Sequence, residues 1–134
     1  MSVTLTKQLG PWRPQLLSVL RIVTALLFLE HGTAKLFGFP ASQMPVAAPF
    51  TFIWWVGLLE LVGGVLLAVG LFTRITAFIL SGEMAVAYFM AHAPQSFFPL
   101  QNGGEAAILF CFVFLYVAAA GPGAWAIDGS RNAV

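Results

Sequence analysis

Four apolar stretches separated by short breaker-rich segments limit this chain to a helical membrane fold. The stretches run over about 16–37, 52–72, 75–92 and 104–120. Each is close to the roughly 20 apolar residues that a helix needs to cross the hydrocarbon core of a bilayer. Proline and glycine mark the ends of the stretches, and these residues end helices or begin turns. We therefore predict an all-α membrane protein, a four-transmembrane-helix bundle that forms a single domain over residues 1–134.

The composition agrees with this class. Hydrophobic residues make up 60% of the chain and charged residues only 8%, whereas soluble domains carry about 25% charged residues. The formal net charge is +1, and the chain has no run of basic residues that could bind along a phosphate backbone. We therefore expect no nucleic-acid partner. The first apolar stretch is too long for a cleavable signal peptide, and it continues into Glu30, His31 and Lys35 instead of a small-residue cleavage site.

The positive charges predict the orientation of the bundle. They are concentrated toward one end of the expected helices, at Lys7, Arg13, Arg21, Arg74 and Arg131. Only Lys35 lies toward the opposite end. Because loops rich in Lys and Arg stay on the cytoplasmic side, we predict that both termini are cytoplasmic and that the two long Pro-rich loops face outward.

Each apolar stretch contains one glutamate, and two histidines accompany the glutamates. These residues are Glu30, Glu60, Glu83, Glu105, His31 and His92. An ionisable side chain within a bilayer is costly and usually faces the bundle interior, a partner or a water-filled cavity. The alternative is a protonated carboxyl that only donates a hydrogen bond between helices. Four antiparallel spans would place most of these residues in the outer half of the membrane. This arrangement predicts a shared polar pocket there.

Helical spacing shows which of these residues share a face. Glu60 lies on a stripe of small residues with Gly57, Gly64 and Ala68, so we expect it to point into the bundle where helices approach closely. Glu83 and His92 are nine residues apart and fall on opposite sides of an ideal helix.

The neighbours Glu30 and His31 differ by about 100° around their helix. The acids and histidines therefore cannot all meet, and at least one of Glu30 and His92 is expected at the interface or bonded to a loop. In the last stretch, Glu105 shares a face with Leu109, Phe112 and Tyr116.

Three kinds of chemistry can be considered for this group: a metal site, a proton-coupled site and a proton-driven exporter, and four acids with two long outer loops fit the exporter poorly. Di-iron carboxylate bundles use Glu-x-x-His, which places both ligands on one face, and this motif is absent from the chain; we expect no metal. A proton-exchanging site fits better, because carboxyl and imidazole groups can exchange protons near neutral pH. Reduction of a quinone takes up protons with electrons. Aromatic residues that could line such a pocket, or form an interfacial belt, are Phe28, Trp54, Trp55, Phe89, Phe97 and Phe98.

Several short pieces between Leu20 and Asp128 resemble, in order and spacing, the DoxX family of small four-span bacterial membrane proteins. The pieces are Arg21, residues 30–38 with the pattern H-G-x-x-K-L-F-G, residues 57–64, residues 70–74, Ala91-His92, Gly103-Gly104-Glu105, and Gly121-Pro122-Gly123 with Asp128. The resemblance implies a four-helix bundle in the bacterial inner membrane. It also implies a link to respiratory or sulfur redox chemistry, since the family's namesakes are tied to a terminal quinol oxidase and a thiosulfate:quinone oxidoreductase.

The positions that match the family pattern are His31, Lys35, Glu60, Arg74, His92 and Glu105. Glu30 and Glu83 fall outside it. We therefore predict that His31, Glu60, His92 and Glu105 line a ligand site, with Lys35 as counter-ion; no catalytic residue is assigned.

The expected function is to bind a quinone-like or other small redox ligand and to assist an oxidoreductase. The alternatives are a small-molecule or proton-coupled membrane transporter and a structural anchor for a partner. The expected partners are the lipid bilayer, a redox protein or small-molecule ligand, and further copies of the chain in a homo-oligomer. Quinone is the one cofactor that the pattern suggests.

Overall fold

The computed structural model describes residues 2–129, and every regular element in that range is a helix. The four main helices are α2 (Arg13–Phe37), α3 (Phe52–Val69), α4 (Thr73–Ala87) and α6 (Glu105–Ala120). The shorter ones are α1 (Ser2–Leu9), the 3-10 helix η1 (Gly10–Trp12), the π-helix η2 (Tyr88–His92) and α5 (Pro99–Asn102). Arg131, which contributed to the predicted orientation, lies outside the described residues.

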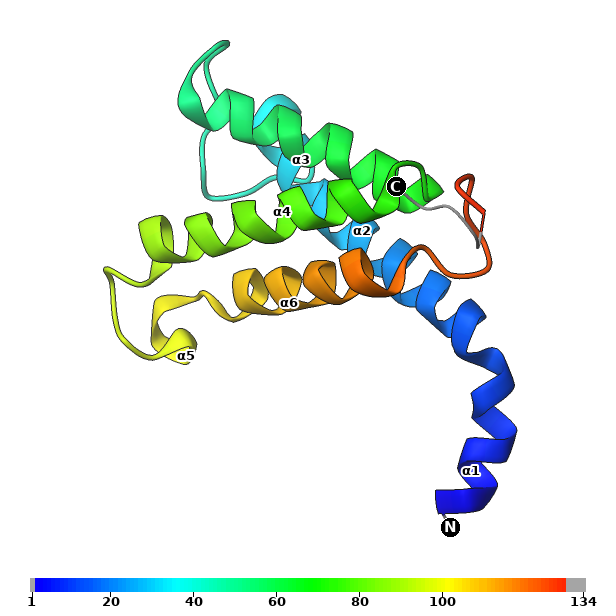
Figure 1. Ribbon diagram of the computed structural model, residues 1–134. Coiled ribbons are helices and arrows are strands. Elements are labelled where there is room, and N and C mark those ends of the chain that lie inside the picture. The colour runs from blue at the N-terminus through cyan, green and yellow to red at the C-terminus, as the bar shows by residue number, and fades with distance from the viewer. Residues whose placement is uncertain (1, 130–134) are drawn as a thin grey trace.

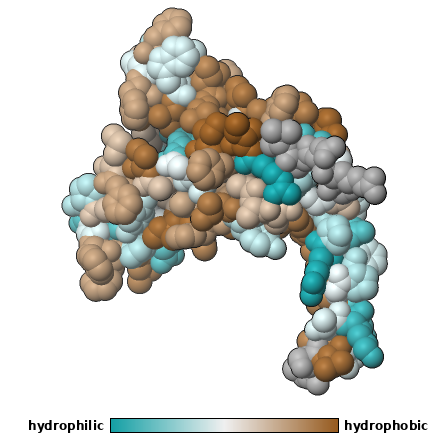
Figure 2. Space-filling view, viewed as in Figure 1, coloured by the Kyte–Doolittle hydropathy of each residue, from teal (hydrophilic) through white to brown (hydrophobic). Residues whose placement is uncertain are grey.

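The helices are apolar enough for a membrane protein. Three helical segments are long and apolar enough to cross a bilayer: Val3–Phe37, Phe52–Val69 and Thr73–His92. Helix α6 has 16 residues, which at about 1.5 Å per residue gives about 24 Å, somewhat less than the roughly 30 Å of the hydrocarbon core. The predicted all-α membrane class is confirmed, with three helices of full spanning length and a fourth that is shorter. Apolar side chains cover much of the bundle surface (Figure 2).

The helix boundaries differ from the predicted ones mainly at the first segment. Helix extends back to α1, far before residue 16, because Pro11 and Pro14 occupy the first positions of η1 and α2. At those positions a missing N–H costs nothing. Helix α3 ends at Val69 because Gly70 adopts the left-handed conformation (φ 71°), and α4 then begins earlier than expected, at Thr73. Helix α5 was not anticipated.

The bundle is built from two closely packed helix pairs. Helix α2 packs mainly on α3 and α4 mainly on α6, with smaller contacts between the pairs; Figure 1 shows α3, α4 and α6 lying roughly parallel, and α1 extending away from the bundle. Aromatic packing joins the pairs, since Phe28 on α2 and Phe114 on α6 pack edge to face with their ring centroids 5.0 Å apart. Leu80 on α4 packs on Gly63 of α3, where a Cβ would lie 2.9 Å from the leucine methyl carbons.

The C-terminal residues return across the end of the bundle and accept hydrogen bonds from the buried side chain of Arg21. Arg21 is 1% exposed and donates hydrogen bonds to the carbonyl of Pro122 and, at 2.5 Å, to that of Trp125. The Ser18 hydroxyl donates to the Pro122 carbonyl at 3.1 Å and accepts from the Trp125 amide at 2.9 Å. Backbone carbonyls thus replace water around a charge that would be costly to bury alone. The sequence associated Arg21 only with orientation and family resemblance.

The same tail caps the N-terminus of α4. The Asp128 carboxylate accepts hydrogen bonds from the amides of Phe72 (2.9 Å) and Thr73 (2.8 Å), at the start of α4. These are unpaired donors that a helix N-terminus presents to an anion. Burial raises the pKa of Asp128, but the hydrogen bonds of Thr73 and Phe72 and the charge of Arg21 outweigh it, so this pKa lies below its ordinary value. The tail therefore joins α2 to the α3–α4 turn.

Candidate functional site

A buried ion pair connects the first two main helices. Lys35 Nζ on α2 lies 2.7 Å from Oε2 and 2.9 Å from Oε1 of Glu60 on α3. The side chains of Lys35 and Glu60 are 17% and 3% exposed. The prediction that Glu60 points into the bundle is confirmed, and Lys35 is its counter-ion in the structure.

Glycines bring the backbones close enough for this pair to form. At Gly32 of α2, a Cβ would lie 2.7 Å from the Leu61 amide nitrogen and 2.9 Å from the Gly57 carbonyl oxygen of α3. At Gly57, a Cβ would lie 3.0 Å from Cβ of Lys35, so the lysine stem packs over this glycine. The stripe of small residues around Glu60 is therefore a helix contact, of the kind found where membrane helices approach closely.

Glu83 on α4 adds a second carboxylate to the pair. Both of its oxygens are buried, and neither has a hydrogen bond of ordinary geometry within residues 2–129. Its neighbour is Glu60, which acts on it through its charge and through a side-chain hydrogen bond outside ordinary geometry, and the charge of Lys35 acts on it more weakly. Glu83 is predicted from the sequence as an intramembrane acid but not as a ligand residue, because it falls outside the family pattern. Its position near the middle of the third apolar stretch was the available signal.

His31 lies at the rim of the same group. It is exposed, one helical turn from Lys35, and its ring meets the edge of Phe110 on α6 at a centroid distance of 5.8 Å. The charges that act on the imidazole are those of Lys35, Glu60 and Glu30. We call Lys35, Glu60, Glu83 and His31 the polar cluster; it draws on α2, α3 and α4 and touches α6.

His92 lies at the far end of η2 and bonds to a loop. Its Nδ1 is 3.0 Å from the carbonyl oxygen of Asn102, and its ring stacks on Tyr88. The buried Asn102 side chain holds this loop by donating to the Ser96 carbonyl (2.9 Å) and accepting from the Gly104 amide (2.8 Å). Asn102 is not among the residues predicted from the sequence, where its place directly before a glycine pair was the only signal.

Glu105 and Glu30 are both exposed. The face that Glu105 shares with Leu109, Phe112 and Tyr116 points away from the bundle, since these three side chains are 59–66% exposed. Of the five predicted ligand residues, the structure brings together His31, Lys35 and Glu60, and it gives His92 and Glu105 other surroundings.

An aromatic pocket lies beside η2. It has a volume of about 340 Å³ and is lined by Tyr88, Phe89, Ala93, Ser96, Phe97 and Pro99. Phe89 and Phe97 are two of the aromatic residues that the sequence suggested for a ligand pocket. A π-helix inserts an extra residue into a helix and is often found at functional sites.

The polar cluster sets two carboxyl groups against one lysine. With every acid and Lys35 ionised and His31 neutral, the one cation faces two carboxylates, so one negative charge is uncompensated. A proton, or a ligand that donates hydrogen bonds, would compensate it in a medium where buried charge is costly. Within residues 2–129, no group of three or more His, Cys, Asp or Glu side chains is arranged to hold a metal ion.

Comparison with known proteins identifies the family. The DoxX family model matches residues 16–93. The chain is 47% identical to an uncharacterized protein of Haemophilus influenzae over 127 residues, covering 90% of this chain and 93% of the relative. It is 31% identical to the inner membrane protein YqjF of Escherichia coli over 125 residues, covering 85% of this chain and 90% of that protein. No solved structure matches. With more than half of its length inside the family model, this chain belongs to the DoxX family.

Proposed function

We propose that this chain is a multi-pass protein of the bacterial inner membrane in which α2, α3, α4 and α6 all cross the bilayer and both termini are cytoplasmic. Its similarity to YqjF, an inner membrane protein, and the basic residues at one end of the bundle support the proposal. Arg74, in the first turn of α4, donates to the carbonyls of Ala118 and Ala119 near the end of α6. This cation therefore lies at the same end of the bundle as the C-terminal tail.

Reporter fusions test the orientation. A reporter that is active only in the cytoplasm should be active when it is fused after residue 129. It should be inactive when it is inserted after Gln43, in the loop between α2 and α3. The reason is that Lys7, Arg13 and Arg74 hold their end of the bundle inside. A periplasmic C-terminus would show that α6 does not cross the membrane or that the bundle is inverted.

We further propose that the protein binds a quinone-like or other small redox ligand and assists an oxidoreductase. The observation that carries this proposal is the buried Glu83 carboxylate, which has no hydrogen bond of ordinary geometry and lies beside an ion pair that already uses the local cation. Such a group is suited to donate and accept protons. The aromatic pocket offers flat apolar walls for a ring, and α4 continues directly into the helix that lines it. A partner oxidoreductase would supply the electrons.

Infrared difference spectroscopy tests the proton-exchanging role. We expect a change in a carboxyl band between protein loaded with a short-chain quinone and protein loaded with its quinol. The change should vanish in Glu83→Gln, because the amide keeps the size and hydrogen-bonding capacity of the acid but cannot exchange its proton. Glu105→Gln is the matched control, since Glu105 is exposed at the start of α6. A band unaffected by Glu83→Gln, or a protein that binds neither quinone nor quinol, would refute the proposal.

A proton-coupled transporter is the second candidate. The observation that favours it is the arrangement of two tightly packed helix pairs with smaller contacts between them, because the polar cluster spans both pairs. Rocking of one helix group against another around an intramembrane site is how many transporters alternate access. Proton-coupled flux in vesicles would favour this candidate, and a structural anchor would show neither flux nor quinone binding.

A further inference from the structure

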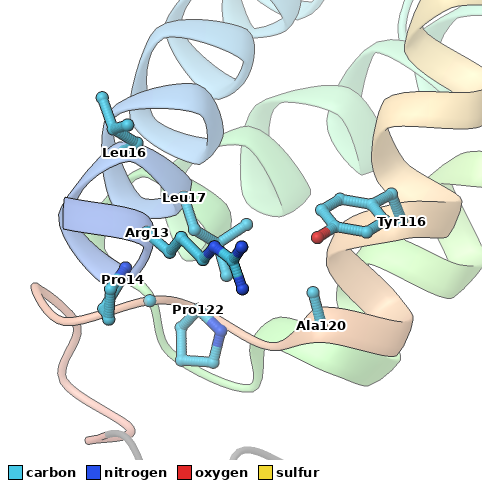
Figure 3. Close-up of a pocket in the computed structure, with 8 residues that line it drawn as sticks. Arg13, Pro14, Leu16, Leu17, Tyr116, Ala120 and Pro122 are labelled. Atoms are coloured by element: carbon cyan, nitrogen blue, oxygen red, sulfur yellow. The ribbon is translucent and has the colours of Figure 1, made fainter. Parts of the chain in front are cut away.

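A groove lies at the opposite end of the bundle from η2, between the start of α2 and the end of α6. Its volume is about 630 Å³. Its lining includes Arg13, Leu16, Leu17, Tyr116, Ala120 and Pro122. In Figure 3 the Arg13 side chain and the Tyr116 hydroxyl approach the open space from opposite sides, with Pro122 and Ala120 below them. The C-terminal tail, bound to Arg21 through Pro122, forms part of its wall.

The groove carries an uncompensated positive charge. Neither the Arg13 guanidinium nor the Tyr116 hydroxyl has a hydrogen-bond or ion-pair partner in the described part of the chain. None of the lining residues is acidic. A guanidinium presents a planar set of donors that matches a phosphate, and a phenol can donate a further hydrogen bond. The polar end of this groove therefore favours an anion with several acceptor oxygens.

The rest of the lining is mostly apolar, and an exposed apolar stripe on each of the two helices begins at the groove. Leu16 begins an exposed stripe on α2 that repeats at helical spacing, through Leu20, Val23 and Leu27. Tyr116 begins a stripe on α6 that runs back through Phe112 and Leu109, all exposed. The site thus has a cation at the end of the bundle and apolar tracks that lead away from it, toward the centre of the helices. This distribution matches a phospholipid, with its phosphate at the membrane surface and its chains along the helices.

We propose that the groove binds an acidic phospholipid, whose phosphate bonds to Arg13 and Tyr116 and whose acyl chains lie along the two stripes. An acidic headgroup suits the site better than a zwitterionic one, because the groove offers a cation and no carboxylate to an ammonium group. A basic side chain near the membrane surface attracts anionic lipid. The site is distinct from the polar cluster; it rests on the proposed crossing of the bilayer by α2 and α6 and not on the proposed redox ligand.

Native mass spectrometry of the detergent-purified full chain tests this inference. Phosphatidylglycerol should bind with one preferred site, and phosphatidylcholine should bind several-fold more weakly. Arg13→Gln should weaken phosphatidylglycerol binding about five- to tenfold, because it removes the cation of the groove. Tyr116→Phe should weaken it about two- to fivefold, because it removes one hydrogen-bond donor and keeps the ring. Since Arg13 is exposed and unpaired within residues 2–129, its replacement should leave the thermal midpoint without lipid unchanged.

Lys7→Gln is the matched control. It removes the same charge from α1, outside the groove, and should leave the affinity for phosphatidylglycerol within about twofold of the original. Equal losses for Lys7→Gln and Arg13→Gln would overturn the proposal in favour of general charge attraction. Glycerol 3-phosphate supplies the same phosphate without chains, so it should not displace the lipid at equal concentration. Displacement by glycerol 3-phosphate would overturn the lipid assignment and identify a site for small soluble anions.

Discussion

Lys35→Met should lower the free energy of unfolding by about 3–5 kcal/mol, because it leaves the Glu60 carboxylate buried without its counter-ion. Glu60 is 3% exposed, and Lys35 supplies hydrogen bonds to both of its oxygens. The measurement is reversible unfolding of the full chain in bicelles. Lys7→Met, on the exposed α1, is the control for loss of a lysine and should be neutral within about 0.5 kcal/mol.

A double variant separates the cost of the unpaired charge from the contribution of the pair. Lys35→Met combined with Glu60→Leu removes both charges, and it should recover most of the stability lost in Lys35→Met, since apolar replacement of a buried pair is often neutral. A double variant as unstable as Lys35→Met alone would contradict this account and assign the loss to packing of the lysine stem on Gly57 or to Glu83, which then has no cation beside it.

Gly32→Ala should destabilise the protein by about 1–3 kcal/mol through overpacking. The added methyl group would meet the Leu61 nitrogen at 2.7 Å and the Gly57 oxygen at 2.9 Å, and both are backbone atoms that move only if α2 and α3 separate. Separation of these helices would also lengthen the Lys35–Glu60 pair. Thermal unfolding in detergent, monitored by helical circular dichroism, measures the effect.

Gly82→Ala is the matched control for this substitution. Gly82 also lies within a helix, α4, but a Cβ there would have no heavy atom within 4 Å. We expect no loss of stability, because alanine is the better helix former and has free space. If the two alanine variants had the same thermal midpoint, the close approach of α2 and α3 at Gly32 would be wrong.

The amino-acid sequence by itself determined the class of the fold. Four apolar stretches and their proline and glycine boundaries give α2, α3, α4 and α6, because membrane helices must satisfy their own backbone hydrogen bonds and be long enough to span the bilayer. Helical periodicity also placed Glu60 on a face of small residues, which the structure shows to be the contact with α2. These are local properties, so they are readable along one helix at a time.

Only the tertiary structure decided which faces meet. Periodicity defines the face that Glu83 occupies but not the neighbour opposite, and the packing of α4 brings that face toward Glu60 and Lys35. In the same structure His92 bonds to the loop at Asn102 and Glu105 is exposed, although both residues match the family pattern. Arg21 and the Pro122 carbonyl lie 101 positions apart in the chain. A contact between residues so far apart in the chain depends on where α6 ends relative to α2. No local sequence pattern encodes that position.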